Sequence, residues 1–231
     1  LFAGSERAVY ISFDAGEHWQ SLRLNMPATS VRDLVIKDDD LVIGTHGRGF
    51  WILDNITPLR QLTNQLINQS TVLYKPADTY RVRWNTRTDT PLPQEEPAGE
   101  NPPDGAMIDY YLKENAEKIQ LEIADDKGNI IRKYSASDTL YKIPEGNVPG
   151  YWIRPQEKLS GKEGSNLFLC ALRYEALNIP ATYPISAIYK NTAPVETSPW
   201  VMPGNYTARL TTGDKTYEQS FTVKSDPRIK T

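Results

Sequence analysis

A polar turn set between two runs of β-forming residues constrains this chain more than any other feature. The segment 12–19 reads Ser-Phe-Asp-Ala-Gly-Glu-His-Trp, and a Gly-containing turn between two such runs is typical of a β-hairpin. Asp14 can accept hydrogen bonds from the backbone of its own turn, Gly16 permits a positive φ, and Trp19 can cover the turn with its indole ring. We therefore predict a structural role for these three residues, together with Ser12.

The turn lies within a sequence repeat. Residues 1–19 align without gaps with residues 41–59, at an offset of 40 residues, so that Tyr10 matches Phe50. A period of about 40–45 residues with several short strands is typical of the blades of a β-propeller. Each blade is a four-stranded sheet that needs a neighbour on both faces. The repeat therefore predicts an all-β fold in which residues 1–75 form the last one to two blades of a partial propeller.

The strands expected in this region divide between two blades. They are expected at residues 1–4, 8–13, 19–24, 31–37, 41–45, 50–53 and 71–74. Residues 1–24 would supply the three outer strands of a blade whose innermost strand is absent, and residues 31–53 would supply the inner three strands of the next, with 71–74 as its outer strand. Thr57, followed by Pro, predicts the N-cap of a helix near residues 58–67. Because an incomplete blade exposes an edge and an apolar face, we expect the isolated chain to self-associate.

The rest of the chain has a different pattern. Residues 76–104 are rich in Pro, which favours extended chain, and are predicted to be a linker in which Tyr80–Trp84 alternates like an edge strand. We expect residues 86–100 to be mobile. From residue 105, strands are expected at 106–112, 118–124, 129–134, 166–173, 205–211 and 216–223, with turns at 125–128 and 212–215. This pattern predicts an immunoglobulin-like β-sandwich over residues 105–225, followed by a tail at 226–231.

Composition argues against several classes of function. The 231 residues carry a net charge of −3, which gives no reason to expect a nucleic-acid partner. No apolar run approaches the length of a bilayer, so no membrane span is expected. Cys170 is the only cysteine, so it cannot form an internal disulfide. Its apolar neighbours indicate that it packs as a small apolar residue.

Several segments carry a resemblance to one family of proteins. The segment 12–19 is an Asp-box, also called a BNR repeat, and the second repeat continues with Gly44-Thr-His-Gly-Arg-Gly-Phe-Trp-Ile-Leu-Asp54. The further segments that carry the resemblance are 31–34, 101–111, 183–189, 199–206 and 226–231. Together they resemble the C-terminal part of bacterial sortilin-like BNR-repeat proteins of the "glycosyl hydrolase" type.

The resemblance implies a place for the chain in a larger protein. It implies the C-terminal fragment of a secreted, periplasmic or cell-surface protein, whose partner is the rest of its own propeller. The hydrolase label of the family follows from shared Asp-boxes, and is therefore an analogy of fold. The chain departs from the family at Cys170-Ala171, where relatives tend to have Trp-Asp.

Two loops form the candidate pocket face. Each joins the second and third strands of an expected blade, and they carry Glu6, Arg7, His46 and Arg48. Histidine titrates near neutral pH, and arginine suits a carboxylate or a phosphate, so these loops are candidates for binding a glycan or a peptide. The alternative is that the glycines on either side of Arg48 make its loop a tight connector.

A set of aromatic residues in the long loops of the expected sandwich is the candidate aromatic surface. Its members are Tyr151, Trp152, Tyr183, Tyr189 and Trp200. Aromatic faces stack on sugar rings, so a carbohydrate-binding accessory domain is one interpretation. The other is that these rings clamp long loops onto the sandwich or pack it against the propeller.

No catalytic residue, cofactor or metal site is predicted. The acidic runs 38–40 and 125–126 are interpreted as solvated turns rather than cation sites. Glycosidase chemistry needs two facing carboxylates, and the sequence shows no such pair. We therefore expect a structural role together with ligand or protein binding. The alternatives are part of a glycoside hydrolase whose catalytic carboxylates lie mainly in missing blades, or a carbohydrate-binding accessory domain.

Overall fold

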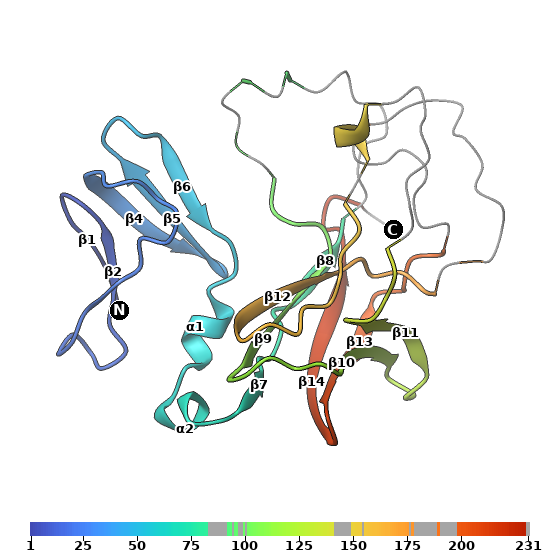
Figure 1. Ribbon diagram of the computed structural model, residues 1–231. Helices are drawn as coiled ribbons and strands as arrows, with labels where there is room; N and C mark the ends of the chain where they lie inside the picture. The colour runs from blue at the N-terminus through green and yellow to red at the C-terminus, as the bar shows by residue number, and fades with distance from the viewer. Residues whose placement is uncertain are drawn as a thin grey trace. The chain divides into compact units, whose positions relative to one another are not determined.

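The protein consists of two all-β units (Figure 1). The structure, a computed structural model, describes residues 1–82, 92–93, 95–96, 99, 101–140, 149–153, 155–175, 177, 189 and 198–229. Of these residues, 43% lie in strands and 6% in helices, and one sheet curls into a half-barrel. The first unit is Leu1–Asn68 and the second is Gln69–Thr231. The prediction of an all-β chain is therefore confirmed.

The first unit contains two three-stranded antiparallel sheets, each built from consecutive strands. Their orders are β1-β2-β3 and β4-β5-β6. The strands are β1 (Phe2–Gly4), β2 (Val9–Ile11), β3 (Gln20–Ser21), β4 (Val31–Lys37), β5 (Asp40–Thr45) and β6 (Phe50–Leu53). The six strands predicted between residues 1 and 53 are thus confirmed, although those of the first sheet are shorter than expected.

One face of each sheet packs into a shared apolar cluster. Val9 of β2 is buried there together with Leu41 and Ile43 of β5. The remaining members are Met26 and Ile56, with Phe2, Leu22, Val31, Leu34, Trp51, Leu53 and Leu59 packed against them. Burial of an aliphatic side chain of this size contributes about 1.5–3 kcal/mol, so this cluster is the main source of stability for the first unit.

Equivalent hydrogen bonds close the β1-β2 hairpin of the first sheet and the β5-β6 hairpin of the second sheet. The N–H of Ser5 donates to the carbonyl of Ala8 at 2.9 Å, and the N–H of Thr45 donates to the carbonyl of Gly49 at 3.2 Å. The side-chain hydroxyls of the same two residues also donate to these carbonyls. The loop after β5 is therefore one residue longer than the loop after β1.

Because of this extra residue, the ungapped alignment of residues 1–19 with residues 41–59 is wrong beyond the loop. Gly4 pairs with Val9 in the first sheet, and Gly44 pairs with Phe50 in the second. Phe50 is therefore equivalent to Val9 and not to Tyr10. The offset of 40 residues holds for β1 and β5, and increases by one for β2 and β6.

Two short helices follow the second sheet, where a single helix was expected. They are α1 (Thr57–Gln61) and α2 (Asn64–Ile67). The predicted N-cap at Thr57 is wrong, because the N-cap residue is the buried Ile56, and the side-chain oxygen of Asn55 accepts a hydrogen bond from the N–H of Thr57 at 3.2 Å. Among the described residues, no helix has the length and apolar character needed to cross a membrane.

The second unit contains a five-stranded sheet and a three-stranded sheet. Their orders are β11-β10-β13-β14-β8 and β12-β9-β7 (Figure 1). The elements are β7 (Thr71–Leu73), β8 (Thr79–Arg81), β9 (Ala106–Leu112), β10 (Ile119–Asp125), β11 (Ile130–Ser135), the 3₁₀ turn η1 (Gly150–Trp152), β12 (Gly164–Cys170), β13 (Gly204–Thr212) and β14 (Lys215–Ser225). The six strands predicted beyond residue 105 and both of their hairpins are confirmed.

Side chains from both sheets of the second unit form one buried cluster. Ile108 of β9 and Phe168 of β12 meet Leu121 of β10 and Leu210 of β13 in this cluster. Along β9, buried residues alternate with partly exposed ones, as expected for a strand with one face on a core. Cys170 belongs to the same cluster and is 2% exposed, so its predicted apolar packing is confirmed.

Two segments expected elsewhere join the second unit. Thr71–Leu73 was expected as the outer strand of the last blade, but it pairs with β9 as β7, and all three of its residues are buried. That expectation is wrong, because pairing with a covered strand lets the segment bury both of its faces. Within the expected linker, β8 lies parallel to β14 as an edge strand. The predicted mobility of residues 86–100 falls mainly outside the described residues.

Candidate functional site

The turn that joins β2 to β3 is held together by the side chains of Ser12 and Asp14. The Ser12 hydroxyl accepts a hydrogen bond from the N–H of Gly16 at 2.8 Å and donates one to Oδ1 of Asp14 at 2.9 Å. Gly16 has a φ of 102°, which only Gly adopts without strain. A Cβ on Gly16 would lie 3.8 Å from the Trp19 ring, so the indole covers the turn, although Trp19 remains 42% exposed.

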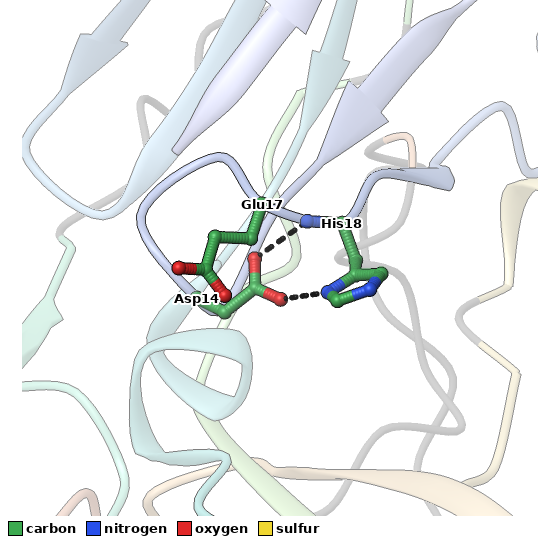
Figure 2. Close-up of side chains that lie close together, drawn as sticks. All are labelled: Asp14, Glu17 and His18. Carbon is green, nitrogen blue, oxygen red and sulfur yellow. Dashed lines mark hydrogen bonds and ion pairs between the residues drawn. The ribbon is translucent and has the colours of Figure 1, made fainter.

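Asp14 also fixes the second half of this turn through His18. Its Oδ1 accepts a hydrogen bond from the N–H of His18 at 2.9 Å, and its Oδ2 lies 2.6 Å from Nδ1 of the His18 ring. Figure 2 shows both interactions, with the carboxylate of Glu17 beside that of Asp14. Sequence reasoning missed His18, although its spacing of four residues from Asp14 is the signal that could have indicated the pair.

These hydrogen bonds hold the pKa of Asp14 well below its ordinary value. The backbone N–H of His18 contributes most, followed by the His18 ring, and the Ser12 hydroxyl contributes less. Since the folded-state pKa is depressed, the ionised carboxylate stabilises the fold fully above the unfolded-state pKa of about 4. That contribution is lost as the pH falls toward the folded-state value.

We expect Asp14→Asn to make the first unit less stable near neutral pH, by an amount that shrinks on acidification. The difference should shrink below about pH 5, because Asp14 is then protonated in the unfolded state but not in the folded state, which favours unfolding of the wild type. Hydrogen exchange of the β2 amides, measured by NMR from about pH 6 to pH 3, checks this. Glu17→Gln is the matched control, since among the described residues its carboxylate accepts no hydrogen bond. A difference between Asp14→Asn and the wild type that stays constant with pH would contradict the prediction.

The same turn brings three ligand atoms within reach of one cation. One atom each from Asp14, Glu17 and His18 lies within 4.8 Å of the other two, and carboxylate and imidazole groups suit ions such as Zn²⁺. All three residues are exposed, and a bound ion would have to separate Nδ1 of His18 from Oδ2 of Asp14. The hydrogen bonds already give these groups a structural use, and we propose no metal site here.

The two loops of the candidate pocket face share one anchor. The N–H of Val31 donates to the carbonyl of Ser5 at 2.9 Å, and the N–H of His46 donates to the carbonyl of Ser30 at 2.9 Å. Since residues 30 and 31 are adjacent in the chain, the loop that carries Glu6 and the loop that carries His46 are brought together. In the first sheet, the loop that carries Glu6 lies at the start of β2, and the Ser12–Trp19 turn lies at its other end.

The side chains of this face point into solvent. The candidate residues Glu6, Arg7, His46 and Arg48 are all exposed. Glu6 pairs with Arg32 at 3.5 Å, and such surface pairs contribute little to stability. The carbonyl of Arg48 accepts a hydrogen bond from the indole of Trp51 at 3.0 Å, and the two glycines of this loop have φ values of 78° and 69°. The second loop is thus a tight connector that still presents a cationic side chain.

Three residues of the candidate aromatic surface gather at η1. The ring centroids of Tyr151 and Tyr189 are 6.4 Å apart, and those of Trp152 and Tyr189 are also 6.4 Å apart. Tyr151 and Tyr189 are 42% and 37% exposed. Trp200 instead lies under the guanidinium of Arg173, 4.8 Å from the ring centroid. Tyr183 lies outside the described residues.

The acidic runs bind groups of the protein itself. Each carboxylate of the run 38–40 has a different partner. These partners are Lys37 for Asp38, Arg60 for Asp39 and the N–H of Asn55 for Asp40. Asp125 likewise accepts hydrogen bonds from the turn that follows it. These contacts agree with the interpretation of both runs as turns.

The chain was compared with models of protein families, with curated proteins and with solved structures. None of the three comparisons gives a match. Its function is therefore inferred from the residues and contacts described above.

Proposed function

We propose that this chain is the C-terminal scaffold and binding part of a secreted or cell-surface Asp-box propeller protein. In this proposal the two sheets of the first unit are terminal blades, and the two sheets of the second unit form an immunoglobulin-like sandwich. The equivalence of the two hairpins and the packing of one sheet on the next support the first assignment. The common core of the two sheets of the second unit supports the assignment of an immunoglobulin-like sandwich.

The proposed binding site is the candidate pocket face. The observation that carries this proposal is the shared anchor at Ser30 and Val31, which brings the two loops together. Arg7, His46 and Arg48 are exposed around it, whereas Glu6 is engaged with Arg32. Because arginine forms paired hydrogen bonds to carboxylates, we propose a glycan that carries a carboxylate group as the ligand.

A glycan array that holds both neutral and uronic-acid glycans tests this proposal. We expect binding to the acidic glycans, and at least about a tenfold loss in the double variant Arg7→Ala/Arg48→Ala, since hydrogen bonds between charged groups contribute about 1.5–3 kcal/mol each. Arg23→Ala is the matched control, because this arginine is also exposed in the first unit but lies outside the two loops.

The remaining outcomes separate the alternatives. Equal binding by the double variant and the wild type, combined with a loss in Tyr151→Ala, would assign glycan binding to the aromatic surface of the second unit. Release of free sugar from the array by the full-length parent protein would favour the glycoside hydrolase alternative. Absence of binding to every glycan would overturn the proposed ligand.

A further inference from the structure

We propose that one face of the β4-β5-β6 sheet, which carries Val42 and Phe50, binds a face of the β1-β2-β3 sheet in a second copy of this chain. The second face, called the outer face, carries Ala3 and Tyr10. The contact is head-to-tail, and it repeats the packing that the two sheets already make within one copy. This inference does not depend on the proposed ligand, because it concerns the faces of the sheets and not their loops.

The exposed face of the second sheet is apolar. Val42 pairs with Val35 on one side and with Ile52 on the other, so these three side chains lie on one face, together with Phe50. Phe50 is 84% exposed, Ile52 56% and Val35 52%. Contiguous apolar side chains at such exposure are rare on a surface without a partner.

The repeat identifies what this face is built to contact. With the extra loop residue taken into account, Phe50 is equivalent to Val9, and Val42 is equivalent to Phe2. In the first sheet these equivalents pack into the cluster shared with the second sheet, where Val9 is 0% exposed. In the first repeat this face of the sheet packs on the next sheet. In the second repeat the equivalent face has no such partner among the residues that the structure describes.

The complementary face lies on the first sheet. The second sheet contacts the first through Ile43 and Trp51, and their equivalents in the first sheet are Ala3 and Tyr10. Ala3 and Tyr10 pair with each other and are partly exposed on the face opposite to Val9. Among the described strands, β1 also has a neighbour on one side only, whereas its equivalent β5 has two.

One copy thus carries both halves of a stacking contact. Because the two halves are different surfaces, the contact is heterologous, and it adds further copies instead of stopping at a symmetric dimer. Stacking of equivalent repeats through such faces is the usual way in which repeat units bury their apolar surface. For this chain by itself, the acceptor is a second copy, because each copy exposes the partner surface that the other requires.

Sedimentation velocity of the full chain over a concentration series tests the inference. We expect the mass to rise with concentration beyond that of a dimer, and Phe50→Glu to weaken association by about tenfold or more, since the interface would then bury a charge. Ile67→Glu is the matched control, because Ile67 is 63% exposed in the same unit but lies outside the sheet. Circular dichroism establishes that each variant is folded.

A mixing experiment tests the head-to-tail geometry. Tyr10→Glu should also block association, with Ala3→Glu as a second variant if the first does not fold. A mixture of Phe50→Glu with Tyr10→Glu should form a 1:1 complex, since each protein keeps one intact face. A monomeric wild type at every concentration would overturn the proposal. So would association that survives Tyr10→Glu and Ala3→Glu, because it would show that like faces pair.

Discussion

Replacement of Phe168 by Ala is expected to lower the free energy of unfolding of the second unit by about 3–5 kcal/mol, the range for truncation of a buried aromatic residue. Phe168 is 1% exposed, and its ring centroid is 4.6 Å from that of Tyr134. It lies in the cluster that joins the two sheets. Its removal therefore leaves a cavity lined by both sheets. Hydrogen exchange of the β9 and β12 amides as a function of urea measures the loss.

Leu167→Ala is the matched control for this prediction. Leu167 precedes Phe168 on β12, but its side chain points to the other face and is 48% exposed. Its truncation should cost about 0.5 kcal/mol or less, as for most surface positions. Equal losses in the two variants would show that the cluster between the sheets is not what stabilises this unit.

Gly105→Ala is expected to destabilise the second unit by about 2–6 kcal/mol. Gly105 precedes β9 and has a φ of 124°, a conformation that costs other residues about 1–3 kcal/mol. A Cβ at this position would also overlap the carbonyl oxygen of Cys170, and overpacking of this kind typically costs a further 1–3 kcal/mol or so. Urea unfolding followed by near-UV circular dichroism measures the effect.

Gly164→Ala separates the two causes. Gly164 lies at the other end of the pairing between β9 and β12 and has a φ of 97°, but a Cβ there would meet no atom within 4 Å. This variant should therefore lose only the backbone part, about 1–3 kcal/mol. A loss as large as that of Gly105→Ala would contradict the role assigned to the overlap with Cys170.

Strands and hairpins could be predicted from the sequence because their signals are local. The run Ala106–Leu112 consists mainly of apolar and aromatic residues, and the observed strand has the predicted bounds. The turn at 125–128 combines Asp125 with Gly128, which has a φ of 83°, and hydrogen bonds to the Asp125 side chain close it. Such residues specify a turn without reference to distant parts of the chain.

The errors concern partners that are distant in sequence. Nothing near Thr71–Leu73 indicates that its neighbour is β9, and the helix signal before it suggested that the first unit continued. The extra residue in the loop before Gly49 could not be detected from the sequence, because both repeats have the same pattern of strand, loop and strand. Only the observed pairing of Gly44 with Phe50 places it. The predicted alignment therefore assigned Phe50 to the wrong face of the sheet.

The candidate sites follow the same division. The side chain of Asp14 accepts a hydrogen bond from the N–H of His18 within the same turn, so the residue type of Asp14 was enough to predict a bond of this kind. The repeat placed the loops that carry Glu6 and His46 on one face. The hydrogen bonds that join these loops depend on the segment between the two sheets, and no spacing in the sequence reveals those bonds. The gathering of the aromatic rings at η1 likewise depends on how long loops fold back.

The parallel pairing of β8 with β14 has a consequence for the order of events on the ribosome. Thr79 pairs with Val223, and β14 is the strand that β8 joins among the described strands, so this pairing must wait until almost the whole second unit has been synthesised. The sheets of the first unit, in contrast, pair strands that are consecutive in the chain. Local pairings form faster than distant ones. The first unit can therefore fold during translation, whereas the five-stranded sheet is completed only after it.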